Sequence, residues 1–293
     1  MKREIADLLD EKRRVVEEAL KSCFKEKKSP EKLYKAMAYS VLSGGKRIRP
    51  ILTLLSFERC GGRDISQILP LACGIEFLHT FALIQDDLPS MDNDDLRRGK
   101  PTLHKATDEA TAILASDALF SSAFELFSKM EIAESERVRV IQEITQAIGP
   151  DGVVGGQVID LDQEKDFNPK TLRHLHYKKT ARLIAASIKC GAILAKAPQR
   201  TIKILERGGV YMGMLFQITD DILDVVSNEK TLGKRTQKDM VQNRLTYPGI
   251  YGLDRTKVWA MGYAKRAKGY FALLGEPFEV FQDITDYILT RSF

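Results

Sequence analysis

An apolar stretch that ends abruptly in acidic residues, FLHTFALIQDDLPSMD at residues 77–92, is the feature around which the chain is organised. Its first eight residues have the pattern of a buried helix, and aspartates follow at Asp86, Asp87 and Asp92. Pro89 has no amide hydrogen to donate, and it disfavours helical geometry at the residue before it. We therefore expect the helix to end near Asp87 and a short loop to bring Asp92 back toward the pair.

A second stretch repeats this design, VYMGMLFQITDDILD at residues 210–224. Asp220 and Asp224 are four residues apart, so both carboxylates lie on one face of the expected helix. Carboxylates this close repel one another unless a cation lies among them, and Mg²⁺ is commonly shared between a few carboxylates and substrate phosphates. Aspartates are also frequent in solvated turns. Two clusters at the ends of apolar helices, each followed by basic residues, favour a metal site.

Composition limits the classes of protein that the chain can belong to. Its 293 residues, 44% hydrophobic and 29% charged, are long enough for one large domain or two, and we predict a single domain over residues 1–293. The formal net charge of +5 is too small to indicate nucleic-acid binding by itself. The four cysteines have no C-x-x-C spacing, which is typical of reduced thiols in a cytosolic protein; they are Cys23, Cys60, Cys73 and Cys190.

The amino terminus has no apolar core of the kind that a secretory signal carries, so we expect a cytoplasmic protein. No membrane span is expected, because the apolar stretch at residues 181–197 contains Arg182, Lys189 and Lys196.

Helical periodicity extends over nearly the whole chain, and no alternating strand pattern or tight hairpin turn interrupts it. Helix starts are indicated at Pro30, Asp108 and Asn168, where capping residues or proline precede periodic segments. We predict an all-α fold, a single bundle of about ten or more helices around a central apolar cavity, with functional groups projecting inward.

Basic residues supply the other half of the expected site. Lys46, Arg47 and Arg49 lie in a turn that follows two glycines and opens a helix, where free amides also attract an anion. A single basic run usually marks a solvated face. Acids and bases that cluster together favour a substrate whose phosphates are bridged to metal, because Arg and Lys both bind phosphate oxygens. The remaining clusters are Arg97-Arg98, Lys178-Lys179, Lys234-Arg235 and Arg244.

This combination resembles the trans-isoprenyl diphosphate synthases, specifically the short-chain bacterial farnesyl or geranylgeranyl type. The motifs occur in the family's order from about Gly44 to Pro248. A single aspartate motif would be weak evidence, but two aspartate motifs together with the other family motifs form a specific signal. The matching segments are Gly44-Gly45-Lys46-Arg47-Ile48-Arg49-Pro50, Asp86-Asp87-x4-Asp92, Asp94-Asp95-Leu96-Arg97-Arg98-Gly99, Gly155-Gly156-Gln157, Lys179-Thr180, Phe216-Gln217-x2-Asp220-Asp221-Ile222-Leu223-Asp224, Gly233-Lys234 and Thr246-Tyr247-Pro248.

The resemblance implies a fold of the isoprenoid synthase type, a homodimer, and a Mg²⁺-dependent enzyme that joins an allylic diphosphate to isopentenyl diphosphate and releases pyrophosphate. It implies that Asp86, Asp92 and Asp220 hold Mg²⁺, with Asp87, Asp221 and Asp224 as further ligands or supports. Contacts to the allylic substrate are implied for Arg97, Lys179, Thr180, Gln217 and Lys234, and contacts to isopentenyl diphosphate for Lys46, Arg49, His79 and Arg98. The residues expected to carry catalysis are Asp86, Asp92, Lys179, Asp220 and Lys234.

The chemistry agrees with this implication. Breaking a carbon–oxygen bond to form an allylic cation leaves pyrophosphate as the departing anion, and pre-placed cations lower that barrier. No histidine is obviously placed to accept the proton released afterwards, so the pyrophosphate is the expected acceptor, as in the family's mechanism. His79, two helical turns before Asp86, is expected to contact a diphosphate, although a lone histidine on an apolar helix is more often a core residue.

In the family, a bulky residue five positions before the first aspartate closes the pocket that receives the growing chain. Phe81 holds that position, about 7 Å along the helix from Asp86. We therefore predict farnesyl diphosphate as product, with geranylgeranyl diphosphate as runner-up because of the small Ala82 beside it. Phe81 as ordinary core filler is the competing interpretation.

Two positions depart from the family's pattern: Gln237 stands where a small residue is expected, and Arg244 where lysine is usual. Three alternatives stay open. They are a catalytically silent subunit of a prenyltransferase heteromer, an all-α Mg²⁺-dependent phosphohydrolase, and a terpene cyclase, against which the second aspartate motif argues.

Overall fold

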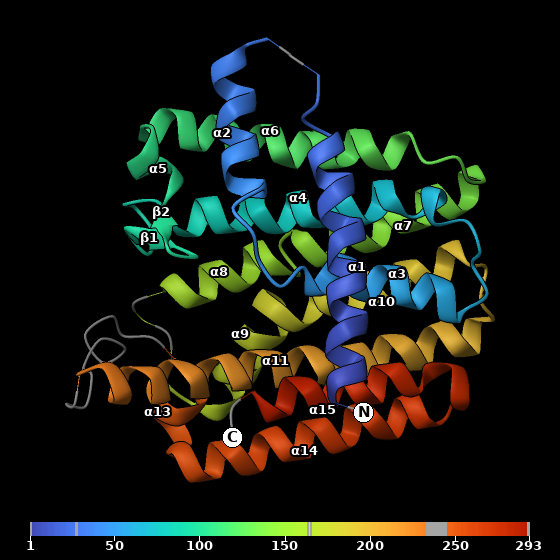
Figure 1. Cartoon of the computed structure of the whole chain (residues 1–293). Coiled ribbons are helices and arrows are strands. Elements are labelled where there is room, and N and C mark those ends of the chain that lie inside the picture. The colour runs from blue at the N-terminus through green and yellow to red at the C-terminus, as the bar shows by residue number, and fades with distance from the viewer. Residues whose placement is uncertain (1, 27–28, 163, 165, 233–244, 292–293) are drawn as a thin grey trace. The chain divides into compact units, whose positions relative to one another are not determined.

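The computed structural model describes residues 2–26, 29–162, 164, 166–232 and 245–291, and these residues are mostly helical (Figure 1). The chain divides into two compact units, each described here by itself. The N-terminal unit comprises residues 6–145 and 190–197, and the C-terminal unit lies within residues 1–5, 146–189 and 198–293. The predicted all-α fold class is confirmed. That one domain spans residues 1–293 stays a prediction.

The core of the N-terminal unit is formed by α4 (Leu69–Asp86), which packs against α6 (Glu109–Ser128) and α3 (Ile48–Arg59). Gly74 allows the close approach of α4 and α6, because a Cβ at this position would collide with the ring of Phe127. Gln85 Nε2 donates to Ser116 Oγ at 2.9 Å near the other end of the same contact. The remaining helices that lie wholly or mainly in this unit are α1 (Lys2–Ser22), α2 (Glu31–Val41), η1 (Ile65–Gln67), α5 (Leu103–Ala106) and α7 (Glu134–Ile148).

The C-terminal unit is built around α11 (Gln199–Leu232), which packs along α14 (Leu253–Ala272). Gly208 of α11 permits this contact, since a Cβ there would overlap the buried ring of Phe271. The other helices that lie wholly or partly in this unit are α8 (Val153–Leu161), α9 (Pro169–His176), the π-helix η2 (Tyr177–Ala181), α10 (Arg182–Leu194), α13 (Tyr247–Tyr251), η3 (Glu276–Phe278) and α15 (Glu279–Thr290).

Several helix starts follow the capping signals of the sequence. Asp108 accepts a hydrogen bond from the amide of Thr111 at the start of α6, and Asn168 accepts from Lys170 and Thr171 at the start of α9. Pro30 precedes the first residue of α2. The side-chain oxygens of Asp108 and Asn168 satisfy amide groups that have no partner within the helix.

The sequence pattern did not predict one element, a short antiparallel hairpin of β1 (Leu96–Arg97) and β2 (Lys100–Pro101). Leu96 pairs with Pro101 and Arg97 with Lys100, while the turn residues Arg98 and Gly99 both have positive φ. Strands of two residues are too short to show alternating hydrophobicity, so the pattern could not indicate them.

Two helical stretches, Ile65–Asp86 and Glu109–Ser128, are long and apolar enough to cross a membrane by length and composition. The most apolar parts of these stretches are 61% and 39% buried inside the protein, respectively. Because the two helices α4 and α6 pack against each other, they also have the character of core helices, which can share this length and apolar composition. The absence of a membrane span stays a prediction.

Candidate functional site

The first acidic cluster follows the C-terminal end of α4 in the N-terminal unit. Asp87 is the residue after the helix, and the chain then turns at Leu88 and Pro89. The amide of Asp92 donates to the carbonyl oxygen of Asp86 at 2.9 Å. The expected loop that carries Asp92 back to the aspartate pair is therefore confirmed.

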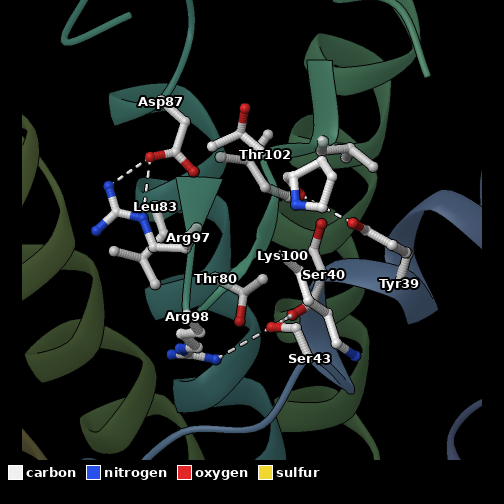
Figure 2. A pocket seen from close by; sticks show the side chains of 13 residues that line it. Tyr39, Ser40, Ser43, Thr80, Leu83, Asp87, Arg97, Arg98, Lys100 and Thr102 are labelled. Carbon is white, nitrogen blue, oxygen red and sulfur yellow. Dashed lines mark hydrogen bonds and ion pairs between the residues drawn. The ribbon is translucent and has the colours of Figure 1, made fainter. Parts of the chain in front are cut away.

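Asp87 is buried and bound by the hairpin. Arg97 Nε donates to Asp87 Oδ1 at 3.0 Å, and Nη2 of the same guanidinium donates to the same oxygen (Figure 2). Arg97 also lies 3.4 Å from Asp94. Burial raises the pKa of Asp87, against the effect of Arg97, and the neighbouring carboxylates raise it further. Arg97 thus supplies a counter-charge to the one buried carboxylate of this cluster.

A pocket lies between α2, α4 and the hairpin (Figure 2). Arg98 reaches back toward the glycine turn, donating to the carbonyl oxygen of Gly44 and to Ser43 Oγ at 3.4 Å (Figure 2). Arg97 and Arg98 therefore both line this pocket with Asp87. The full lining is Tyr39, Ser40, Ser43, Thr80, Leu83, Ile84, Asp87, Arg97, Arg98, Lys100, Pro101, Thr102 and Leu103.

Arg47, in the basic turn, has a structural position. Its side chain is fully buried, with Nε 2.7 Å from Glu17 and Nη1 2.5 Å from Glu76, and Nη2 donates to the carbonyl oxygen of Val41. The backbone of Arg47 is left-handed, with φ of 49°. This residue therefore joins α1, α2 and α4 at the start of α3, and its charge is used within the protein.

The neighbours of Arg47 are placed differently. Lys46 is exposed, whereas Arg49 is buried with Nη1 3.3 Å from His79 Nε2. Burial lowers the pKa of His79 well below its ordinary value, and the surrounding arginines lower it further. His79 is therefore neutral at pH 7, and its ring nitrogen can accept a hydrogen bond from Arg49. Two predicted diphosphate contacts, Arg49 and His79, lie side by side.

The second acidic cluster lies on α11 in the C-terminal unit. Asp221 Oδ1 accepts from Gln217 Nε2 at 2.9 Å, and Oδ2 accepts from the amide of Tyr247 at 3.1 Å. Burial raises the pKa of Asp221 to about 8, and Asp224 and Asp220 add to the rise. Asp224 is exposed and lies four residues after Asp220, on the same helical face.

Lys179 belongs to the π-helix η2, a geometry that is frequent at functional sites. Its Nζ donates to Asp160 Oδ2 at 2.7 Å. Gly156 of α8 allows the close approach, because a Cβ there would lie 2.5 Å from the amide nitrogen of Lys179. Thr180 Oγ1 donates to Gln217 Oε1 at 2.7 Å. Lys179, Thr180 and Gln217, predicted together as substrate contacts, are indeed neighbours.

A pocket opens beside these residues. His176 lines it 3.8 Å from Asp221, and burial lowers the pKa of this histidine to about 3. The pocket has both acidic and basic walls. Its lining residues are Asp160, Leu175, His176, Lys179, Gln217, Asp221, Asp224, Leu245 and Thr246.

Four residues near the second cluster were not assigned a role from the sequence: Asp160, His176, Tyr247 and Arg291. Asp160 could have been found from its place four residues after Gly156, on the same helical face. Arg291 donates to Asp220 Oδ1 at 2.9 Å from 71 positions away, and no local pattern indicates this pair.

Among the described residues, no group of three or more acidic, cysteine or histidine side chains lies close enough to hold a metal ion by itself. The donor set still fits Mg²⁺, which takes oxygen ligands and typically keeps waters while binding one or two carboxylates and substrate phosphates. Lys234, Gln237, Arg244 and the Gly233-Lys234 motif lie outside the described residues. The two clusters belong to different units, so their meeting around one substrate stays a prediction.

Comparison with known proteins identifies the family. The family model described as polyprenyl synthetase matches residues 30–263. A farnesyl diphosphate synthase of Geobacillus stearothermophilus is 44% identical over 86% of this chain and 86% of its own length. The large subunit 1 of a heterodimeric geranylgeranyl pyrophosphate synthase of Arabidopsis thaliana is 44% identical over 82% of this chain and 67% of its own.

Solved structures agree. An FPP/GFPP synthase from Zymomonas mobilis aligns with a TM-score of 0.87 and 30% identity over 99% of this chain and 100% of its own. The predicted isoprenoid synthase fold and the predicted enzyme class are therefore confirmed. The chain belongs to the polyprenyl synthetase family and is a prenyltransferase.

Proposed function

We propose that this enzyme condenses isopentenyl diphosphate with dimethylallyl and geranyl diphosphates to give farnesyl diphosphate, with Mg²⁺ as cofactor. One observation carries the proposal: the pocket of the C-terminal unit gathers Lys179 and Gln217 with two aspartates of the second cluster. A polar pocket with both signs of charge suits a diphosphate that is bridged to a divalent cation.

The aspartates divide into two proposed roles. Asp86, Asp92 and Asp220 would hold Mg²⁺, which when bound supplies Lewis-acid stabilisation of the departing pyrophosphate. Asp87 and Asp221 already accept hydrogen bonds from Arg97, Gln217 and the Tyr247 amide, so we assign them to orienting their clusters. Asp224, exposed on the face of Asp220, is assigned as a further ligand.

The cationic side chains divide between the two substrates. Lys179 and Arg97, with Thr180, Gln217 and Lys234, would bind the allylic diphosphate and stabilise the negative charge that grows as its carbon–oxygen bond breaks. Lys46, Arg49, His79 and Arg98 would anchor isopentenyl diphosphate. Its double bond then attacks the allylic cation to form the new carbon–carbon bond, and the proton lost afterwards passes to pyrophosphate.

Water must be kept from the cation, since hydrolysis would compete with condensation. The apolar helix α4 leads directly to the first cluster, and most of its residues are buried. This arrangement favours condensation over the phosphohydrolase alternative, which requires room for an attacking water.

Incubation with isopentenyl diphosphate, dimethylallyl diphosphate and Mg²⁺, followed by chromatography, tests the proposal. We expect a fifteen-carbon diphosphate. Release of phosphate without a prenyl product would indicate a hydrolase, and no reaction at all would indicate a silent subunit of a heteromer. A cyclic hydrocarbon would indicate a terpene cyclase.

Phe81 is proposed to close the chain-elongation pocket. It is half-buried on α4, and its ring lies 5.0 Å from that of Phe120. Phe81→Ala should shift the product to twenty carbons or more, because the small side chain opens space below the first cluster. Phe167→Ala, an exposed phenylalanine in the C-terminal unit, is the control. An unchanged product would show that Phe81 is core filler; a wild-type product of twenty carbons would make the enzyme a geranylgeranyl diphosphate synthase.

We further propose that the enzyme acts in the cytoplasm as a homodimer. Leu114 and Ile113 on α6 are 60% and 43% exposed, and apolar side chains of this size can be covered by a second copy. Light scattering coupled to size-exclusion chromatography should give about twice the mass of the 33.0 kDa chain.

A further inference from the structure

The end of α15 contacts the second acidic cluster. Arg291 is the last residue that the structure describes, and its Nη2 donates to Asp220 Oδ1 at 2.9 Å. The guanidinium also lies over the ring of Phe216, 5.0 Å from its centroid. Phe216 and Asp220 are one helical turn apart on α11, so a single side chain covers both.

This pair is partly shielded from solvent. The side chain of Arg291 is 15% exposed and that of Asp220 is 35% exposed. Packing on an aromatic face and a directed hydrogen bond suit the planar guanidinium, and lysine would reproduce only the charge. The contact is therefore specific enough to fix the orientation of the Asp220 carboxylate.

Asp220 is also one of the residues assigned to Mg²⁺ above. A guanidinium and a divalent cation that approach the same carboxylate repel each other, and the repulsion is strong where solvent is partly excluded. Binding of Mg²⁺ at Asp220 must therefore weaken or displace the ion pair with Arg291.

We propose that Arg291 is a positioning residue that orients Asp220 in the metal-free protein and competes with Mg²⁺ for its carboxylate. The C-terminal helix then sets how much Mg²⁺ the second cluster requires. This inference rests on the proposed function, because it needs Asp220 to be a metal ligand.

A titration of the full chain with Mg²⁺ at fixed pyrophosphate tests the competition without measuring turnover. Trp259, the only tryptophan of the sequence, gives the signal. Its ring lies 6.3 Å from that of Tyr247, whose amide binds Asp221. We expect Arg291→Gln to lower the half-saturating Mg²⁺ concentration about fivefold, the size of a modest ion pair. Arg291→Lys, which keeps the charge, should restore most of the wild-type requirement.

Lys268→Gln is the matched control, because Lys268 of α14 forms a comparable ion pair with α15: its Nζ lies 2.6 Å from Asp286 Oδ2. Both glutamine variants should lower the melting temperature of the metal-free protein, and the control should leave the Mg²⁺ requirement unchanged. When Mg²⁺ and pyrophosphate are added, the difference in melting temperature from wild type should shrink for Arg291→Gln and stay the same for Lys268→Gln.

An unchanged Mg²⁺ requirement in Arg291→Gln would overturn the inference. A higher requirement would also overturn it, because Arg291 would then help to bind the anion. Should Arg291→Gln fail to fold, the double variant Asp220→Asn with Arg291→Gln makes the decision, because it leaves neither partner of the pair charged. The inference requires that this double variant has the same Mg²⁺ requirement as Asp220→Asn alone. A wild-type protein that shows no Mg²⁺ transition and forms no prenyl product overturns the proposed function, and this inference with it.

Discussion

Asp87 and Asp221 are the second residue of Asp-Asp pairs that look alike in sequence, yet the two units stabilise them by different means. Asp87 is held by the guanidinium of Arg97, a full positive charge. Asp221 is held by an amide side chain and a backbone N–H, which are neutral donors. Both are buried, and burial raises both pKa values, that of Asp221 to about 8.

The difference teaches that the protonation state of a buried carboxylate depends on whether its hydrogen-bond donor is charged or neutral. An arginine can keep a buried carboxylate ionised, whereas neutral donors leave the carboxylate free to take up a proton instead. We expect the first cluster to be sensitive to loss of its arginine and the second to be sensitive to pH.

The variants with the largest expected effect test whether both acidic clusters serve the same reaction. Asp86→Ala and Asp220→Ala should each lower the rate of condensation by about 1000-fold, because each removes a proposed oxygen ligand of Mg²⁺. Incorporation of labelled isopentenyl diphosphate measures the rate. Asp151→Ala, at an exposed residue outside both clusters, should keep the wild-type rate. Full activity in both aspartate variants would contradict the proposed site.

A smaller effect, on the free energy of unfolding, should show how Asp87 and Asp221 depend on their different partners. Arg97→Ala leaves the buried Asp87 without its counter-charge and should lower the free energy of unfolding by about 2–3 kcal/mol, less than for a fully buried pair because Arg97 is partly exposed. Gln217→Ala should cost about 1 kcal/mol, since Asp221 keeps the Tyr247 amide and can be protonated. Urea unfolding at pH 7 with chelator measures both. Equal losses would show that charge makes no difference here.

The most delicate test concerns pH in the second cluster. The pKa of His176 falls from 6.5 to about 3 on folding, so as pH drops below 6.5 the unfolded chain binds a proton that the native protein cannot, and stability is lost. The pKa of Asp221 rises from 3.8 to about 8, so its contribution is present at low pH and is lost as pH rises toward 8.

Between pH 4 and 6.5 these two contributions oppose each other. Relative to wild type, His176→Asn should therefore lose stability as pH rises, and Asp221→Asn should gain it, each by at most about 1.4 kcal/mol per pH unit. The measurement is urea unfolding at several pH values with chelator present. Parallel pH profiles for the two variants would contradict the opposed pKa shifts.

Much of the fold and of the site was accessible from the sequence because it depends on local rules. Pro89 indicated the end of α4 near Asp87, and the capping residues Asp108 and Asn168 indicated two helix starts. The resemblance to the family placed Lys179, Thr180 and Gln217 in one group, and the structure brings them together. The two-residue strands of the hairpin escaped, because no periodicity can appear over so short a length.

The sequence by itself determined the helical class and the family, since these follow from periodicity and from ordered motifs; the residues that bear the chemistry stay a prediction. Only the tertiary structure decided which charges are already used. Arg47 and Arg49 look equivalent in the basic turn, yet Arg47 is ion-paired with Glu17 and Glu76, whereas Arg49 lies against His79. Asp220 pairs with Arg291 from 71 positions away. Ion pairs of this kind depend on how helices pack, because burial and distance set the electrostatic energy and neither is encoded in local sequence.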